Sequence, residues 1–260
     1  MRIRFLLVDA LNLIRRVYAA QPGDDGPDKV KGSQTACSQS LQRALRETRP
    51  THAVCVFEGE GASWRHLQHA GYKAGRSPMP TALKTGLPGF EEAFSHQGIC
   101  SLKFSSLEAD DVIATLAAKV ATRQGRVKIL STDKMFLQLL SPRISVRDHF
   151  RQLELDATYL HQKFGVKPEQ FLDFLSLTGD SANNIQGVPG VGSKTAKVLL
   201  DAYGSLEEVL SAAHRIKGKL GKRLKQHADD ARFAQTLVRL KVDLQLGVNL
   251  QSFRLKMFPS

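Results

Sequence analysis

The chain has 260 residues, of which 42% are hydrophobic and 24% charged. This apolar content excludes a disordered chain and is enough for one large domain, or for a core domain with an appendage. The net charge of +12 favours a polyanionic partner, most simply nucleic acid, with an anionic membrane surface as the alternative. No apolar run approaches the length of a transmembrane helix, so we expect no membrane insertion.

The first half of the chain alternates short apolar runs with helical stretches, which predicts an α/β domain. The first run covers residues 4–8 and ends at Asp9, a helical stretch follows over about 34–48, and a second run over 52–57 ends at Glu58. Uninterrupted apolar runs of this length are typical of strands buried on both faces of a parallel sheet.

Residues 59–90 differ from their surroundings because they are rich in Gly, Pro, His and basic residues. The segment is too long for a passive connection, so we expect a functional lid or arch. A disordered surface loop is the alternative.

Acidic residues open the next helical stretch, predicted over 108–124. Glu108 and Asp111 are three residues apart and share a face, whereas Asp110 projects differently. Acids in a first turn also complement the helix dipole, which is the structural alternative to a functional role.

A third apolar run over 126–131 is closely followed by Asp133 and by a short helical stretch over 133–140. The carboxyl ends of parallel strands lie at one edge of a sheet, where sites form. We therefore expect six carboxylates to converge there, although helix capping would explain any single one. The six are Asp9, Glu58, Glu108, Asp110, Asp111 and Asp133.

Six neighbouring carboxylates would repel one another unless cations neutralise them. Hard oxygen donors without nearby thiolates suit Mg²⁺, with Mn²⁺ as a substitute. An acidic pocket in a strongly basic protein points to metal-assisted phosphodiester chemistry.

Beyond about residue 155 the chain is mostly helical and contains a glycine-rich turn, Gly-Val-Pro-Gly-Val-Gly-Ser-Lys-Thr, over 187–195. A P-loop is disfavoured because Ser193 separates the last glycine from the lysine. The turn instead predicts a helix–hairpin–helix whose backbone amides bind a DNA phosphate ahead of a helix beginning near Lys194. Carbonyl groups of the same turn offer ligands for a monovalent cation.

A run of six cations without an acid lies between residues 215 and 225. A surface that contacts phosphates and a solvated basic face are both consistent with it. The cations expected on DNA are Lys217, Lys219, Lys222 and Arg223.

The three cysteines, Cys37, Cys55 and Cys100, are far apart and form no CxxC pair. This usage fits a reducing, cytoplasmic location and disfavours a disulfide framework or a thiolate zinc site. No apolar heptad is present, so we expect a monomer.

Five ordered motifs resemble the 5′-nuclease (flap endonuclease) superfamily over nearly the whole chain, and within it the short bacterial Xni, or exonuclease IX, branch. The motifs are Val8-Asp9-Ala10-Leu11-Asn12, Tyr72-Lys73-Ala74-Gly75-Arg76, Glu108-Ala109-Asp110-Asp111, Ser131-Thr132-Asp133-Lys134 and Gly187-Val-Pro-Gly-Val-Gly192. The resemblance implies an α/β fold with a PIN-like, mostly parallel sheet, a helical arch and a helix-3-turn-helix DNA-binding region. The corresponding domains are residues 1–154 with the arch at about 59–95, then 155–235, then a C-terminal segment over 236–260 that packs back on the core.

The resemblance also assigns roles to individual residues. The six carboxylates fall at metal-site positions, joined by Asp180, and Asp110 is the expected catalytic ligand. Lys73 and Arg76 correspond to arch bases that steady the scissile phosphate, with Arg65 assisting on the DNA.

In the Xni branch, the resemblance places a K⁺ ion at the hairpin. The expected carbonyl donors are Leu177, Thr178, Gln186, Val188 and Val191. The stretch expected to contact DNA comprises Gly190, Val191, Gly192, Ser193, Lys194 and Thr195.

Three positions depart from the family pattern. Glu58 replaces an Asp, Met135 stands where a full second metal cluster has Asp, and Asn183 replaces the second Asp of Gly-Asp-x-x-Asp. A thioether is a poor Mg²⁺ ligand, so the second metal site is reduced.

These inferences predict a structure-specific 5′ flap endonuclease that uses Mg²⁺ and acts on 5′-flap DNA or branched duplex ends. Two alternatives remain open at this point. One is a flap-binding or branched-DNA-binding protein with weak or lost catalysis, motivated by Met135 and Asn183. The other is a PIN-type ribonuclease, which the acidic cluster alone would permit.

Overall fold

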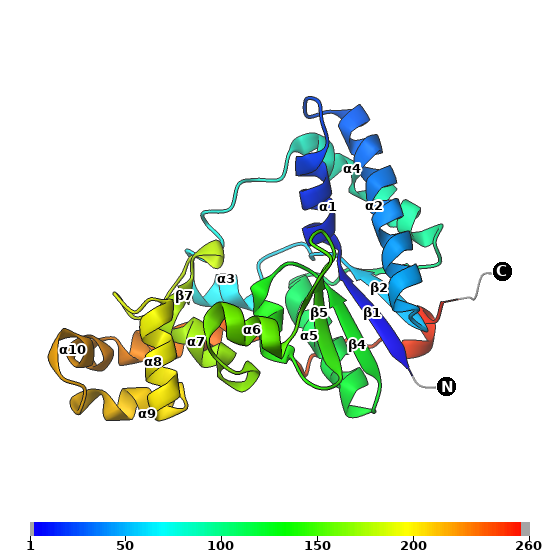
Figure 1. Cartoon of the computed structure of the whole chain (residues 1–260). Helices are drawn as coiled ribbons and strands as arrows, with labels where there is room; N and C mark the ends of the chain where they lie inside the picture. Colours follow the sequence, from blue (N-terminus) through cyan, green and yellow to red (C-terminus); the bar gives the residue numbers. More distant parts are fainter. Residues whose placement is uncertain (1–2, 256–260) are drawn as a thin grey trace. The chain divides into compact units, whose positions relative to one another are not determined.

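The computed structural model describes residues 3–255 and divides into two compact units. The first contains residues up to Gly61, Pro78–Glu154 and the chain from Lys241 onward. The second contains Ala62–Ser77 and Leu155–Leu240. Figure 1 shows the elements of both units in chain order.

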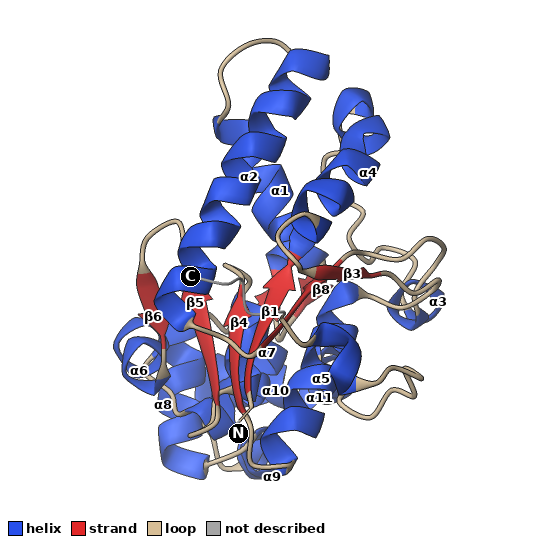
Figure 2. Cartoon of the chain, turned by 90° about the vertical axis from the view of Figure 1, so that its right-hand side faces the viewer, coloured by secondary structure: helices blue, strands red, loops and turns tan. Residues whose placement is uncertain are grey.

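The first unit contains a six-stranded sheet with the order β3-β2-β1-β4-β5-β6 (Figure 2). The paired strands from β3 to β5 run parallel, with Leu7 opposite Val54 on one side and Ile129 on the other. The central strands are apolar and buried on both faces, as expected for a parallel sheet. The strands are β1 (Arg4–Asp9), β2 (His52–Val56), β3 (Cys100–Leu102), β4 (Arg126–Leu130), β5 (Ile144–Asp148) and β6 (Leu153–Leu155).

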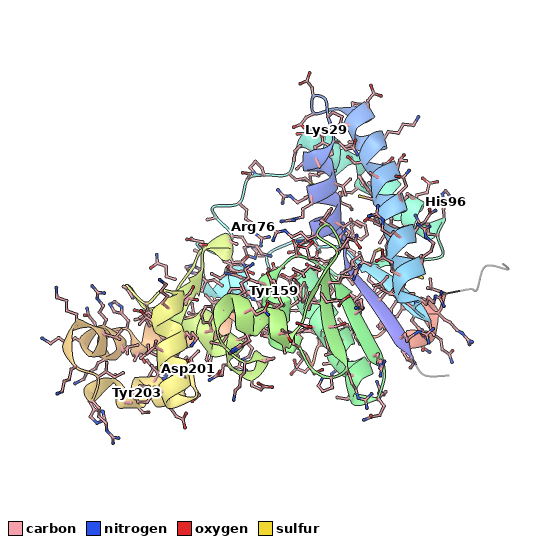
Figure 3. The ribbon with its side chains drawn as sticks, viewed as in Figure 1. Lys29, Arg76, His96, Tyr159, Asp201 and Tyr203 are labelled. Carbon is pink, nitrogen blue, oxygen red and sulfur yellow. The ribbon has the colours of Figure 1, made fainter. Side chains whose placement is uncertain are left out.

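Helices cover both faces of this sheet. One core cluster joins Leu6, Val8 and Leu130 to side chains of three helices, and the fourth helix contacts β1 and β4. The helices of this unit are α1 (Ala10–Ala20), α2 (Pro27–Thr48), α4 (Thr81–Ser95) and α5 (Ala109–Thr122), with 3₁₀ turns η1 (Lys134–Leu139) and η5 (Leu250–Phe253). Lys29, at the start of α2 (Figure 3), lies over the Tyr18 ring of α1 at 4.8 Å.

Helix α4 runs through part of the segment predicted as a lid. Leu83, Phe90 and Phe94 lie on its buried face. A Cβ on Gly86 would collide with Val30, and one on Gly89 would collide with Gln34, both on α2. The glycines that suggested a loop therefore permit close packing of two helices.

The C-terminal segment packs on the first unit. Phe253 stacks on Phe5 with ring centroids 5.7 Å apart, and Leu255 N donates to Thr51 O at 3.1 Å. Residues 256–260 of the predicted C-terminal segment lie outside the described residues.

The second unit is helical apart from a short antiparallel hairpin that pairs Gly179 with Gln186. Its helices are α3 (Trp64–Gln68), α6 (Ala157–Phe164), α7 (Phe171–Thr178), α8 (Ser193–Tyr203), α9 (Leu206–Ser211), α10 (Gly218–Gln226) and α11 (Ala228–Val238). The 3₁₀ turns are η2 (Pro168–Gln170), η3 (Ser181–Asn183) and η4 (Ala212–His214), and the hairpin strands are β7 (Gly179–Asp180) and β8 (Ile185–Gln186). Among the described residues, no helix is both long and apolar enough to cross a bilayer.

The structure divides the chain at other places than the predicted domain boundaries. Residues 62–77, predicted as part of an arch on the sheet domain, cluster with the helical unit, as do 236–240. The physical reason is Arg65, whose guanidinium donates to the carbonyls of Leu237 and Arg239 at 2.7 and 2.8 Å.

Candidate functional site

Asp9 lies at the carboxyl end of β1 and caps α1. Its Oδ1 accepts from Asn12 N at 3.2 Å, and its Oδ2 accepts from Ser131 Oγ at 2.8 Å. Ser131 follows β4, and its Oγ in turn accepts from Asp133 N at 3.1 Å. One serine thus links the acids that follow two neighbouring strands.

A second link between the same strands comes from an amide side chain. Asn12 Oδ1 accepts from Thr132 N at 3.1 Å, and Asn12 Nδ2 donates to Thr132 Oγ1 at 3.0 Å. The sequence motifs contain Asn12, Ser131 and Thr132, but the sequence alone predicts no role for them. Their spacing from the acids was the available signal.

Glu58 and the first turn of α5 complete this edge. Glu58 Oε2 accepts from Ala109 N at 3.1 Å, so a carboxylate binds the positive end of the helix. Glu108 is the buried N-cap residue, and Asp110 lies half-buried in the first turn.

The pKa of Asp9 is raised from 3.8 to about 7, mainly by burial and also by the charges of Asp133 and Glu58, and this value already includes the lowering effect of the bonds from Ser131 and Asn12. The three acids are therefore close enough to repel one another, which is the electrostatic situation that a divalent cation relieves. The all-oxygen donor set fits Mg²⁺. Within residues 3–255, however, no group of three or more His, Cys, Asp or Glu side chains is arranged to coordinate a metal ion.

Asp111 holds the C-terminal segment. Its Oδ1 accepts from Lys241 N at 3.0 Å, while Thr115 Oγ1 donates to Lys241 O at 3.1 Å. One turn further on, Lys119 Nζ donates to Leu244 O at 2.7 Å. The expected metal-site residue Asp111 thus also belongs to a row on α5 that binds main chain.

Met135 is buried in η1, where its backbone N donates to Asp133 Oδ1 at 2.8 Å. In place of a carboxylate, the chain has an apolar side chain in the core at this position.

In the second unit, a chain of hydrogen bonds joins three predicted positions. Arg76 Nη2 donates to Asn183 Oδ1 at 2.7 Å, and Asn183 Nδ2 donates to Oδ2 of the buried Asp180 at 2.5 Å. Arg76 lies on the extended segment ahead of α4 (Figure 3). The departure at Asn183 therefore connects an expected arch base to the remaining acid of the second cluster.

The backbone around Lys73 is tied to the same turn. Lys73 N donates to Asn183 O at 3.0 Å, and Asn184 Nδ2 donates to Gly71 O at 2.7 Å. Lys73 has a left-handed φ of 58°, and its Nζ lies 5.2 Å from the centroid of the Tyr72 ring. The structure thus brings Lys73 and Arg76 together with residues 180–184.

Arg65 does not lie where the resemblance placed it. Its side chain is fully buried, with its guanidinium on two main-chain carbonyls, so in this conformation it has no surface to offer a DNA phosphate. Its role is to hold residues 62–77 against the end of α11.

The five residues expected to bind K⁺ gather at the end of α7 and in the turn that follows β8. Leu177 O accepts from Val188 N at 2.9 Å, and Val188 O accepts from Val191 N at 3.0 Å. Thr178 ends α7, Gln186 ends β8, and a Cβ on Gly187 would collide with Leu177 O. The carbonyl end of a helix favours a cation.

The expected DNA-contacting stretch leads into α8. Gly190 has a φ of +77°, and a Cβ there would collide with the Arg223 guanidinium of α10. Gly192 caps α8, and Ser193 and Lys194 are exposed in its first turn. Lys217, Lys219, Lys222 and Arg223 are all exposed on or beside α10.

Two family models together match almost the whole chain. Residues 4–165 match the family described as 5′-3′ exonuclease, N-terminal resolvase-like domain, and residues 166–259 match 5′-3′ exonuclease, C-terminal SAM fold. The chain belongs to the 5′-3′ exonuclease family.

Relatives named flap endonuclease Xni are similar over nearly the whole chain. The one from Photobacterium profundum is 44% identical and covers 98% of each chain. The one from Vibrio cholerae is 41% identical and covers 98% of this chain and 97% of its own. The resemblance to the Xni branch is thereby confirmed.

Two solved structures share the fold. The T5 D15 protein co-crystallised with metal ions has a TM-score of 0.75 at 20% identity, covering 90% of this chain and 88% of its own. The catalytic core of Rad2 in complex with DNA substrate has a TM-score of 0.61 at 16% identity, covering 98% and 83%. The PIN-like sheet domain with a helical C-terminal region is confirmed, and the chain is a metal-dependent nuclease that hydrolyses phosphodiester bonds.

Proposed function

We propose that this nuclease is a structure-specific 5′ flap endonuclease acting on flap or branched DNA as a monomer in the cytoplasm. The observation that carries the proposal is the group of acids at the carboxyl ends of the strands in the first unit. Asp9, Glu58 and Asp133 repel one another there. Ser131 links Asp9 to Asp133 by two hydrogen bonds. The named function of the Xni relatives, at over 40% identity, supports the substrate. The free cysteines support a reducing location.

Mg²⁺, or Mn²⁺ in its place, is the proposed ion, held by Asp9, Glu58, Glu108, Asp110, Asp111 and Asp133. A divalent ion supplies charge neutralisation for these carboxylates and Lewis-acid activation for hydrolysis. Asp110, half-buried in the first turn of α5, is the proposed catalytic ligand. Lys73 and Arg76 are proposed to balance charge on the attacked phosphate, with Arg76 oriented by Asn183.

Duplex DNA is proposed to bind the turn before α8 and the exposed cations of α10. K⁺ would be held by the backbone carbonyls of Leu177, Thr178, Gln186, Val188 and Val191 and would supply positive charge near a DNA phosphate. Replacing K⁺ by Li⁺ at constant ionic strength should weaken binding to duplex DNA in a fluorescence-anisotropy titration. Equal affinity in the two salts would remove the K⁺ assignment.

The test of the nuclease is cleavage of a 5′-labelled flap duplex with Mg²⁺ and with EDTA. The wild type should cut near the junction only with Mg²⁺, and Asp110→Ala should lose cutting while it retains DNA binding. Asp243→Ala, which removes an exposed acid of the same unit, is the matched control and should cut normally. Full activity of Asp110→Ala would overturn the metal assignment.

A second candidate is a flap-binding or branched-DNA-binding protein with weak catalysis. The buried Met135 and the Asn183–Asp180 bond favour it, because neither position supplies a second carboxylate. Tight flap-selective binding without cutting in the same assay would establish this candidate.

A further inference from the structure

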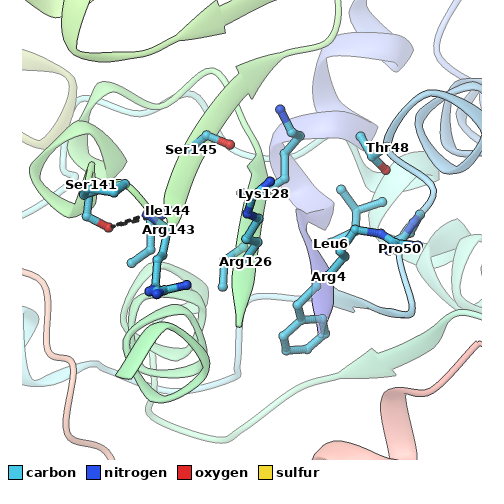
Figure 4. A pocket seen from close by; sticks show the side chains of 13 residues that line it. Arg4, Leu6, Thr48, Pro50, Arg126, Lys128, Ser141, Arg143, Ile144 and Ser145 are labelled. Carbon is cyan, nitrogen blue, oxygen red and sulfur yellow. Dashed lines mark hydrogen bonds between the residues drawn. The ribbon is translucent and has the colours of Figure 1, made fainter. Parts of the chain in front are cut away.

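A cavity of about 420 Å³ lies at the amino-terminal edge of the central sheet, within the first unit. The starts of β1, β4 and β5 form its floor, beside the end of α2 (Figure 4). Its lining residues are Arg4, Phe5, Leu6, Thr48, Pro50, Arg126–Lys128 and Ser141–Ser145. The carboxylates follow the other ends of the same strands, about 16 Å away along β1.

Strand register gathers cations in this cavity. Arg4 is paired with Arg126, and Leu6 with Lys128, so Arg4, Arg126 and Lys128 project from one face of two adjacent strands. Arg143, just before β5, comes next to Arg126, since Val127 N donates to Arg143 O at 2.8 Å. The side chains of Arg4, Arg126 and Arg143 therefore form one row across the starts of three neighbouring strands.

Their charges are not balanced within the cavity. Lys128 pairs with Glu154 at 2.6 Å, but Arg4 Nε donates to the neutral Arg49 O at 2.8 Å, and Arg143 Nη1 donates to the neutral Gln124 O at 3.1 Å. Arg126 N donates to Ile3 O at 2.9 Å, but no hydrogen bond or ion pair joins the Arg126 guanidinium to a described residue, and the described lining includes no Asp or Glu. Clustered guanidinium groups without a carboxylate suit a bound oxyanion.

The rest of the lining suits an organic group attached to that anion. Pro50, Pro142 and Ile144 are apolar, while Thr48 and Ser145 offer hydroxyls. The volume lies within the range of small-molecule sites. A concave, half-apolar cavity fits a compact ligand better than the extended backbone of a duplex.

We propose that this cavity is a second, non-catalytic site that binds a phosphate monoester of about nucleotide size. The phosphate would contact Arg126 between Arg4 and Arg143, and the organic part would lie on Pro50, Pro142 and Ile144. Arg126 is the key position because its guanidinium is available for a bidentate bond. The inference depends on neither the proposed metal ligands nor flap specificity.

The test is isothermal titration of the full chain with 2′-deoxyadenosine 5′-monophosphate, in EDTA so that no divalent ion contributes. Wild type should bind the mononucleotide more tightly than inorganic phosphate. Arg126→Glu should weaken mononucleotide binding at least tenfold because it reverses the charge beside the phosphate. Arg46→Ala, which removes an exposed arginine of α2 outside the cavity, is the control and should bind like wild type. Circular dichroism would show that both variants fold.

A 5′-phosphorylated tetranucleotide separates two sources of the same phosphate monoester. Loss of tetranucleotide binding in Arg126→Glu would assign the cavity to strand ends, whereas binding of the mononucleotide alone would assign it to free nucleotides. Both results support the site. Equal weakening by Arg126→Glu and Arg46→Ala, or no mononucleotide binding at millimolar concentration, would overturn it.

Discussion

At the scale of single residues, the molecule shows how a nuclease of this family holds acids ready for metal. Asp9 does not stand alone, because Ser131 and Asn12 fix both of its oxygens. These polar neighbours stabilise the ionised form, whereas burial and the neighbouring acids oppose it. The balance leaves Asp9 with a pKa near neutrality.

This balance predicts a pH dependence of stability in the metal-free protein. The pKa of Asp9 is raised from 3.8 to about 7 on folding, so the folded state binds the proton more tightly than the unfolded chain does. This proton stabilises the folded state by up to about 4 kcal/mol. The contribution is fully present below about pH 4 and is lost as pH rises through 7. Thermal unfolding in EDTA between pH 4 and 8 should show the loss.

Asp9→Asn should flatten that profile, because an amide does not titrate. Asp243→Asn, at an exposed position, should keep the wild-type slope. An unchanged slope in Asp9→Asn would assign the pH dependence to other groups.

Asn183 is the second residue whose replacement is informative. Asn183→Ala removes the amide that donates to the buried Asp180 and the carbonyl that accepts from Arg76. We expect the free energy of unfolding to fall by about 1–3 kcal/mol. Urea denaturation would measure it, with Asn249→Ala, which removes an exposed cap, as the comparison. A loss no larger than that of Asn249→Ala would show that the bonds contribute little.

At the scale of elements, helix α5 both carries acids at the sheet edge and binds the C-terminal segment. Its first turn carries Glu108 and Asp110 at the sheet edge, while Asp111, Thr115 and Lys119 bind the main chain of residues 241–244. The C-terminal segment is thus attached to the helix that carries the expected catalytic acid.

Thr115→Val should weaken that attachment. Thr115 is buried, and its Oγ1 donates to Lys241 O and accepts from Leu244 N, so valine would remove both bonds at a cost of about 1–3 kcal/mol. Thr122→Val on the same helix is the matched control, because Thr122 is exposed and bonds only within α5. Chemical denaturation would compare them, and equal stabilities would contradict the expected role of the threonine.

At the scale of the whole molecule, the net charge of +12 should govern association with DNA. Binding should weaken steeply with salt. Each exposed cation of α10 that contacts a phosphate should contribute about one unit to the slope of log K against log salt. Lys222→Ala should therefore lower the slope by about one, measured by anisotropy on duplex DNA.

Arg46→Ala, at an exposed position on α2 in the first unit, is the control for that measurement. Its slope should match wild type if contacts, rather than total charge, set the salt dependence. Equal slopes in Lys222→Ala and wild type would remove Lys222 from the DNA-binding surface.

The sequence by itself determined the buried strands and the acids after them. The runs at 4–8, 52–57 and 126–131 became β1, β2 and β4, because strands buried on both faces must be continuously apolar. The stretch at 133–140 became a 3₁₀ turn instead of an α-helix. Strand β3 is too short, and β5 too mixed in polarity, to have been recognised without their neighbours.

Only the tertiary structure decided which partners the polar side chains have. The sequence predicts Arg65 to be a DNA-binding surface residue. Its guanidinium instead donates to the carbonyls of Leu237 and Arg239, which are 172 and 174 residues away along the chain. The cationic row of Arg4, Arg126 and Arg143 likewise exists only through strand register, which joins positions that are remote along the chain. Apolar patterning is a local property that the sequence displays, whereas hydrogen-bond pairing depends on contacts between distant segments that folding alone creates.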